Sequence, residues 1–265
     1  SLVVLFLCSA LFEPFPSSRP TQWTGRRSQR PSRPRLLGRA RKGWSLRVAG
    51  SPDSALAGAA ASRDTTLLPV TTEDATALAV PVLRALHLLG LGPEVEAEPV
   101  ASALDDVAER CADANPVDMN PAKEIALALA DDVPVVWGGS VLAARAARRV
   151  AEALRAACGR PAIAGIDSQL VPLLERAPEP DVFADPYEEG VPVSRPSLLV
   201  LDDGAESPTI RLGRDRVLGA AERSAVRVHE VRAVEGPDVG RFAALLATGR
   251  FAAAYLALGL GRPAG

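Results

Sequence analysis

Residues 120–171 read NPAKEIALALADDVPVVWGGSVLAARAARRVAEALRAACGRPAIAGIDSQLV, and this stretch decides the fold class of the chain. Its pattern predicts a helix, a strand, a glycine turn, a second helix and a second strand. The run VPVVW at 133–137 is apolar and rich in β-branched residues, which is typical of a strand buried on both faces. Strands that alternate with helices imply right-handed crossovers between parallel strands. We therefore predict a doubly wound α/β sheet.

The turn Gly138-Gly139-Ser140 follows the first strand, at the place where an open parallel sheet usually binds its ligand. The two glycines permit a sharp turn with backbone N–H groups open to a ligand, and Ser140 can cap the next helix. The N-terminus of that helix would favour an anion. We predict substrate contacts at Gly138, Gly139 and Ser140, with helix–strand packing as the alternative role of the glycines.

The same alternation continues on both sides of this stretch. Upstream, the sequence predicts short strands at 46–49 and 66–70 and helices at 55–61, 73–89 and 99–112. Downstream, it predicts a strand at 198–201, a helix at 212–223, a strand at 226–231, and one or two apolar helices within 237–258, interrupted at Gly249. The α/β class follows from this periodicity alone.

The composition narrows the range of partners. The chain of 265 residues is 48% hydrophobic and 4% aromatic, as expected for a helix-rich α/β protein. Of its 30 basic and 32 acidic residues, ten basic residues and one acidic residue fall within residues 1–52, so residues 53–265 carry a net charge of −11. An acidic globular part argues against nucleic acid as a partner.

Cysteine usage indicates the compartment. The chain has three cysteines, Cys8, Cys111 and Cys158. Their spacing does not match a metal site, and their odd number argues against a disulfide framework. We interpret them as free thiols in a reducing compartment, so we expect a cytoplasmic protein without a metal site.

Several short motifs, in order, resemble one known family. NPAK at 120–123 precedes a helix, PVVWGGS at 134–140 ends a strand, DVFAD lies at 181–185, and AYLALG lies at 254–259. The series resembles the C-terminal half of the bacterial bifunctional phosphoglucose/phosphomannose isomerases, members of the sugar isomerase (SIS) domain superfamily. The resemblance covers roughly residues 45–260. It implies an SIS-type doubly wound parallel sheet flanked by helices, with the second half complete and the first half truncated.

The resemblance also divides the chain. Residues 1–44 form an atypical segment, 45–115 the remnant of a first SIS subdomain with its linker helices, and 116–265 the second SIS subdomain. The run SLVVLFLCSALF at 1–12 is too short to span a bilayer and has no preceding basic residues. It is either the remnant of a secretory signal or a buried strand at 2–7. We favour the strand, because the family has one there, and we expect no membrane partner.

The tract at 13–42 is rich in proline, serine and arginine and predicts a disordered or loosely attached segment. In the family this region holds the serine-rich loop that cradles the sugar phosphate, and that loop is not recognisable here. A basic tract could bind nucleic acid or an anionic membrane. We interpret it instead as a solvated tail or a translated frameshift.

The resemblance implies a glutamate base and a catalytic histidine. Aligned on the Pro-Ala pair that follows, the glutamate position is Ala156, and the His-Asn-Gln position is Asp167-Ser168-Gln169. Alanine cannot take a proton, and Asp167 could replace imidazole only if burial kept its carboxyl group protonated near neutral pH. Glu152 lies one helical turn before Ala156 and could supply a displaced carboxylate. The candidate catalytic residues are therefore Asp167 and Glu152, with Ser168 and Gln169 as substrate contacts.

Three further side chains need an interpretation. Lys123 is the sole lysine after residue 52, and it either faces the substrate or lies on an exposed helix face. We include it among the candidate substrate contacts. His87 lies within an apolar helix and His229 within a strand beside Glu230, and we expect both histidines to be structural.

By resemblance, the function is that of an isomerase that interconverts glucose 6-phosphate or mannose 6-phosphate with fructose 6-phosphate. The family implies no metal or organic cofactor, and it implies a homodimer with the site near the subunit interface. Because the glutamate and histidine are replaced, the alternative is a non-catalytic relative that binds sugar phosphate or acts as a regulatory or scaffolding subunit. A damaged fragment without activity is the third possibility.

Overall fold

The computed structural model describes residues 4–5, 46–50, 58, 65–69, 75–179 and 194–262. The chain forms two compact units, Ser1–Glu96 and Ala97–Gly265. Some expectations from the sequence lie outside the described residues. These are the basic tract at 13–42, all but one residue of the helix at 55–61, and the motif at 181–185.

The first unit contains a small parallel sheet. Its strands are β1 (Val4–Leu5), β2 (Leu46–Gly50) and β3 (Thr65–Pro69), paired in that order. The strand expected at 2–7 is described only at its two central residues, which pair with Leu46 and Arg47. Helix α3 (Ala75–Leu88) follows, and the Nδ1 atom of His87 lies 3.3 Å from the carbonyl oxygen of Gly92 in the turn after it. His87 thus has the structural contact that the sequence analysis expected.

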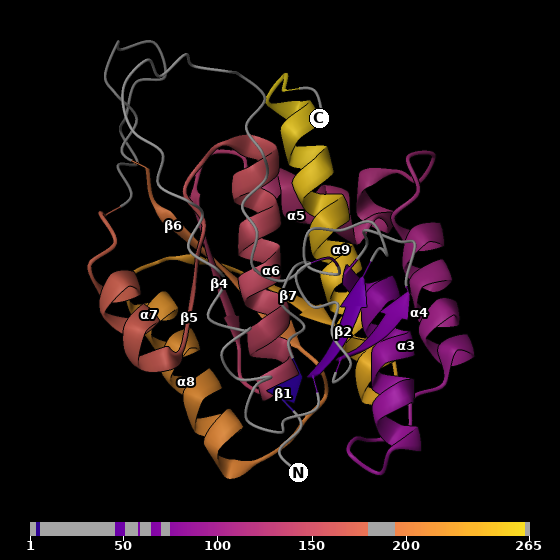
Figure 1. The fold of residues 1–265 in the computed structure, drawn as a ribbon. Coiled ribbons are helices and arrows are strands. Elements are labelled where there is room, and N and C mark those ends of the chain that lie inside the picture. The colour runs from indigo at the N-terminus through magenta and orange to yellow at the C-terminus, as the bar shows by residue number, and fades with distance from the viewer. Residues whose placement is uncertain are drawn as a thin grey trace, which may run out of the picture. The chain divides into compact units, whose positions relative to one another are not determined.

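The second unit alternates helices and strands as the sequence predicts. Its elements are α4 (Ala97–Arg110), the 3-10 turn η1 (Val117–Met119), α5 (Pro121–Ala128), β4 (Val133–Gly138), α6 (Val141–Cys158), β5 (Ile163–Gly165), α7 (Asp167–Glu175), β6 (Pro196–Asp202), α8 (Pro208–Arg223), β7 (Arg227–Arg232) and α9 (Asp238–Gly259). The four strands pair in parallel in the order β5-β4-β6-β7. This is the predicted doubly wound α/β sheet flanked by helices (Figure 1).

Local capping explains where the central helices begin and end. The side chain of Asn120 accepts hydrogen bonds from the N–H groups of Ala122 and Lys123, each at 3.1 Å, and Pro121 occupies the first turn of α5. Helix α6 ends at Gly159, whose φ of 62° is a left-handed conformation that glycine adopts at little cost.

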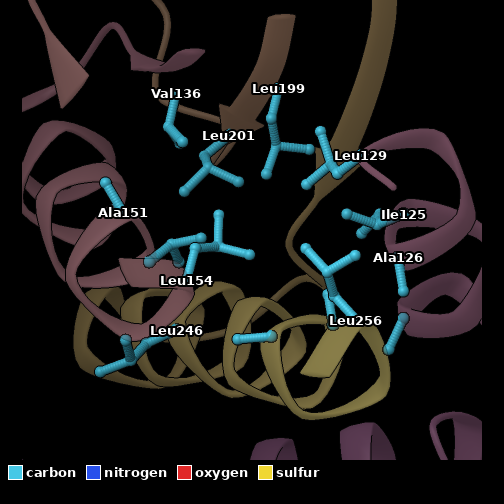
Figure 2. Packing of buried hydrophobic residues seen from close by; sticks show 14 of the residues in the cluster. Ile125, Ala126, Leu129, Val136, Ala151, Leu154, Leu199, Leu201, Leu246 and Leu256 are labelled. Atoms are coloured by element: carbon cyan, nitrogen blue, oxygen red, sulfur yellow. The ribbon is translucent and has the colours of Figure 1, made fainter. Parts of the chain in front are cut away.

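The sheet lies between two helical layers. Helices α7 and α8 cover one face, and α5, α6 and α9 cover the other (Figure 1). Alternate residues of the central strands serve the two cores: Leu199 and Leu201 face α5, α6 and α9, whereas Leu198 and Val200 face α7 and α8. Figure 2 shows the larger cluster, in which side chains from β4 and β6 converge with those of the three helices.

Helix α9 is continuous, so the expected interruption at Gly249 was wrong. A Cβ atom on Gly249 would collide with the side chain of Val150 in α6, including Cγ1 at 2.7 Å. Glycine is therefore needed for the close approach of α6 and α9. Glycine has a low helix propensity, which is why the sequence suggested a break at Gly249. In the structure the same glycine allows α6 and α9 to pack closely.

Helix α9 is long and apolar enough to cross a membrane, and it is the only such helix among the residues that the structure describes. More than half of its apolar window is buried inside the unit, where α9 packs against α4, α5 and α6. Burial of this kind is typical of the central helix of a globular core. Because α9 also packs against α4, the second unit begins at Ala97. The division near residue 115, which rests on resemblance, stays a prediction.

Candidate functional site

The carboxyl ends of the strands hold most of the candidate residues. From β4 the chain passes to β5 on one side and then to β6 on the other, so the crevice between β4 and β6 is the topological switch point of the sheet. Gly138 ends β4 there and is followed by Gly139 and Ser140, while Asp202 ends β6 and is followed by Asp203. Sequence and topology thus agree on the place where a ligand is expected.

Both glycines of the turn have a packing role. A Cβ atom on Gly138 would collide with the backbone of Ala143 in the first turn of α6. A Cβ atom on Gly139 would stand 2.7 Å from the side chains of Trp137 and Ile210. These approaches explain the two glycines without a ligand.

Ser140 links α6 to the end of β6. Its Oγ atom accepts a hydrogen bond from the N–H of Ala143 at 2.9 Å and donates one to Oδ2 of Asp203 at 2.5 Å. Asp203 is 4% exposed and also accepts from the N–H of Ala205 at 3.2 Å. The hydroxyl hydrogen of Ser140 is therefore already used. Within the described chain, the N–H groups of the first two residues of α6 remain without an acceptor, and they are the free donors of this crevice.

Asp167, Ser168 and Gln169 form the first turn of α7. Oδ2 of Asp167 lies 3.1 Å from Nη1 of Arg216 in α8. Gln169 accepts a long hydrogen bond, 3.4 Å, from the N–H of Ile166 and so helps to cap the helix, while Ser168 is exposed. The structure places these three residues at the same edge of the sheet as Ser140.

Asp202 is the centre of an ion-pair network that the sequence analysis did not identify. Its Oδ2 atom lies 3.2 Å from Arg214 and 3.1 Å from Arg232, and its Oδ1 atom accepts from the N–H of Gly204 at 2.8 Å. Burial alone would raise the pKa of Asp202, but the Gly204 N–H and the two arginines outweigh it and lower the pKa. The Asp-Asp-Gly sequence after a buried strand was the signal that could have revealed this network.

Glu152 and Ala156 lie away from this edge. Glu152 is half-exposed and pairs with Arg149 of the same helix at 2.6 Å. It is eleven residues beyond Val141, a rise of about 16 Å along α6. Ala156 is exposed in the last turns of α6, towards the amino ends of the strands. The structure does not bring Glu152 or Ala156 together with Asp167.

Lys123 has a structural environment. Its Nζ atom donates to the carbonyl oxygens of Asp113 and Asn115, each at 2.7 Å, and lies 5.4 Å from the ring centroid of Tyr255 in α9. The side chain thus ties the segment between α4 and α5 to α9. Two of the three ammonium protons are used in this way.

A pocket that the sequence analysis missed lies beside the edge strand β7. It has a volume of about 370 Å³ and is formed by α4, α5, β7 and α9. Its polar side chains include Arg110, Glu124, His229 and Thr248. The Nε2 atom of His229 is buried without a hydrogen-bond partner, and burial lowers the pKa of this imidazole. Within the described residues, no group of three potential ligands could hold a metal ion.

A family model described as the bacterial phospho-glucose isomerase C-terminal SIS domain matches residues 118–263. A search of curated protein sequences finds no match.

Solved structures share the fold. A glucose-6-phosphate isomerase like protein from Thermus thermophilus aligns with a TM-score of 0.53 and 19% identity, over 75% of this chain and 60% of that chain. Tagatose-6-phosphate ketose/aldose isomerase from Escherichia coli aligns with a TM-score of 0.60 and 13% identity, over 83% of this chain and 62% of that chain. A hypothetical protein from Thermus thermophilus aligns with a TM-score of 0.50 and 15% identity, over 80% of this chain and 56% of that chain. The chain thus spans less than two thirds of each of these proteins.

Proposed function

The chain belongs to the family of the bacterial phospho-glucose isomerase C-terminal SIS domain, and from this premise we propose that it is an aldose–ketose isomerase of hexose 6-phosphates. The substrates are glucose 6-phosphate or mannose 6-phosphate, and the product is fructose 6-phosphate. The match over residues 118–263, which spans the sheet of the second unit, is the observation that supports this function. We place the enzyme in the cytoplasm as a homodimer.

The reaction moves hydrogen within one molecule. A base removes the proton from C2 of the open-chain aldose to give an enediolate, a proton moves from the oxygen at C2 to the oxygen at C1, and the base returns its proton at C1, so that no external oxidant or reductant is needed. The residues must bind the phosphate, stabilise the oxygen at C1 and supply the base. The free N–H groups at the start of α6 suit an oxyanion, and the carboxylate of Asp167 at the same edge can accept a proton.

Arg216 has a positioning role in this scheme. Its guanidinium holds Oδ2 of Asp167 at 3.1 Å and leaves Oδ1 for the substrate. Since Asp167 begins α7, its carboxylate also lies at the N-terminal end of that helix. Asp167 is only partly buried and is paired with Arg216, so it lacks the burial that a role in place of the imidazole would require, and we propose it as the base instead.

A second function is favoured by Ala156. The resemblance assigns the catalytic glutamate to this position, and alanine has no group that transfers a proton. Glu152, the carboxylate one turn earlier, is exposed and paired with Arg149 along the same helix, which argues against a displaced base there. On these grounds the alternative function is that of a non-catalytic relative that binds a sugar phosphate.

The decisive experiment measures fructose 6-phosphate formation by the purified chain in a coupled assay, with glucose 6-phosphate and mannose 6-phosphate as separate substrates. Asp167→Ala should lower kcat by about 100-fold or more, the usual contribution of a general base. Asp215→Ala is the matched control, because Asp215 is an exposed aspartate of α8. Turnover that survives Asp167→Ala would exclude Asp167 as the base. Absence of turnover, with thermal stabilisation by a sugar phosphate, would establish the non-catalytic function instead.

A further inference from the structure

The pocket beside β7 contains polar side chains that have few partners in the structure. Arg110 donates only from Nε, to the carbonyl oxygen of Asp106 in its own helix at 3.3 Å, so its terminal N–H groups have no acceptor in the described chain. The exposed Glu124 forms no ion pair with the described residues either, and Nε2 of His229 is buried and unpaired. An unpaired buried polar atom such as Nε2 of His229 is costly, and a ligand that pairs with it recovers that cost. Arg110 and Glu124 are exposed, so a ligand exchanges water for its own polar groups at these two side chains.

Side-chain direction on β7 explains why His229 faces the pocket. Val231 packs on the cluster formed with α5, α6 and α9, and His229 points to the same face because strand residues alternate. Glu230 and Arg232 point to the opposite face, where they pair with Arg214 and Asp202. The side chains of Glu230 and Arg232 are therefore occupied elsewhere.

The backbone of β7 adds donors and acceptors. The N–H of Ala233 donates to the carbonyl oxygen of Asp202 at 2.8 Å, which fixes the parallel ladder between β6 and β7. By alternation, the peptide groups of Val228, Glu230 and Arg232 point away from β6, towards the free edge that borders the pocket. In the described residues nothing pairs with them.

The side chains that line the pocket indicate the chemical class of its ligand. A guanidinium with free N–H groups binds an oxyanion in a two-point contact. A carboxylate, an imidazole and open peptide groups bind hydroxyl groups, which both donate and accept. Ile125, Ala244 and Leu245 give an apolar wall for the carbon skeleton. The volume of about 370 Å³ falls in the usual range for small-molecule pockets. An apolar ligand would leave Nε2 of His229 unpaired and would displace water from Glu124 without replacing its hydrogen bonds.

We propose that this pocket is a binding site for a small anionic polyol, such as a phosphorylated sugar, with the oxyanion on Arg110 and hydroxyl groups on Glu124, His229 and the edge of β7. The site is separate from the crevice at Ser140 and Asp167. It is an additional site for ligand binding, and the proposed isomerase reaction does not depend on it.

Proton and nitrogen NMR of the imidazole rings tests the location directly, because the whole chain has only two histidines. Glucose 6-phosphate is titrated into the purified chain, and His87→Gln assigns the resonances. We expect the signals of His229 to shift with saturation and those of His87 to stay fixed. Unchanged His229 signals at saturating glucose 6-phosphate would overturn the proposal, as would the absence of binding.

Calorimetry with variants tests the ligand class. Arg110→Gln should weaken glucose 6-phosphate binding at least tenfold, and unphosphorylated glucose should bind the native chain at least tenfold more weakly than glucose 6-phosphate. Arg211→Gln, at an exposed arginine of α8, is the matched control and should bind normally. Binding that is lost in Ser140→Ala but kept in Arg110→Gln would move the ligand to the crevice and refute this site. Turnover tests the isomerase function separately, since it is measured with Asp167→Ala.

Discussion

Replacing Gly249 by alanine tests the packing of α6 against α9. Helix propensity alone favours alanine by about 1 kcal/mol. The structure predicts the opposite sign, because the new Cβ atom would stand 2.7 Å from Cγ1 of Val150, a fully buried β-branched residue whose χ1 angle has little freedom. Overpacking of this kind costs about 1–3 kcal/mol. We therefore expect Gly249→Ala to lower the free energy of unfolding by about 1 kcal/mol net, the difference of these two effects.

Urea unfolding at 25 °C, followed by circular dichroism, measures this change. Gly259→Ala is the control, because a Cβ atom on Gly259 would meet nothing within 4 Å, and its stability should be unchanged or higher. In a Val150→Ala background the collision disappears, so Gly249→Ala should no longer destabilise, and the two substitutions should show a coupling energy of about 1 kcal/mol or more. If Gly249→Ala changes the free energy of unfolding no more than Gly259→Ala does, in both the native and the Val150→Ala backgrounds, the close approach of α6 and α9 is not the reason for glycine at position 249.

Two further predictions concern charged groups. Because the pKa of Asp202 in the folded chain is lower than the ordinary value of 3.8, its contribution to stability is present above that value and is lost as the pH falls through the folded pKa. Asp202→Asn should therefore lower stability at pH 7 and flatten its decline in acid, as measured by urea midpoints between pH 7 and pH 2; an unchanged acid decline would exclude the network as its cause. Lys123→Met should lower the free energy of unfolding by about 1.5–3 kcal/mol, since two carbonyl oxygens lose a charged donor. Lys123→Met with native stability in the same assay would mean that these bonds form equally well with water.

The strands and helices of the second unit were predictable because their signals are local. Runs such as VPVVW at 133–137 and LLVLD at 198–202 lie in parallel strands that are buried except at one end residue each, and Asn120 and Ser140 are caps that single residue types reveal. The continuity of α9 was not predictable. Gly249 is a helix-weakening residue in sequence, and its partner Val150 lies 99 positions earlier, so only the packed structure explains it.

The candidate site was likewise predictable in part from the sequence. A glycine turn after a buried strand correctly pointed to the carboxyl edge of the sheet, yet the occupied hydroxyl of Ser140 depends on Asp203, which lies 63 residues away. The pocket beside β7 was missed because its lining comes from four separate elements. Arg110 and Glu124 are exposed helix residues in the structure as well, so only their convergence marks the pocket, and His229 showed no ligand motif. Convergence of distant side chains leaves no pattern in a single sequence.

The charged residues of β7 have a consequence for the behaviour of the chain at high concentration. A strand with one open edge is a template for pairing with the same strand of another copy, which leads to aggregation. On β7, the exposed side chains of Arg227, Glu230 and Arg232 stand on the two faces of the strand beside that edge, and Glu230 and Arg232 stay exposed although they pair with Arg214 and Asp202. If two copies paired in parallel register, like charges would stand opposite one another, which opposes the pairing. The arginines and the glutamate thus act as gatekeepers that oppose growth of the sheet from one molecule to the next.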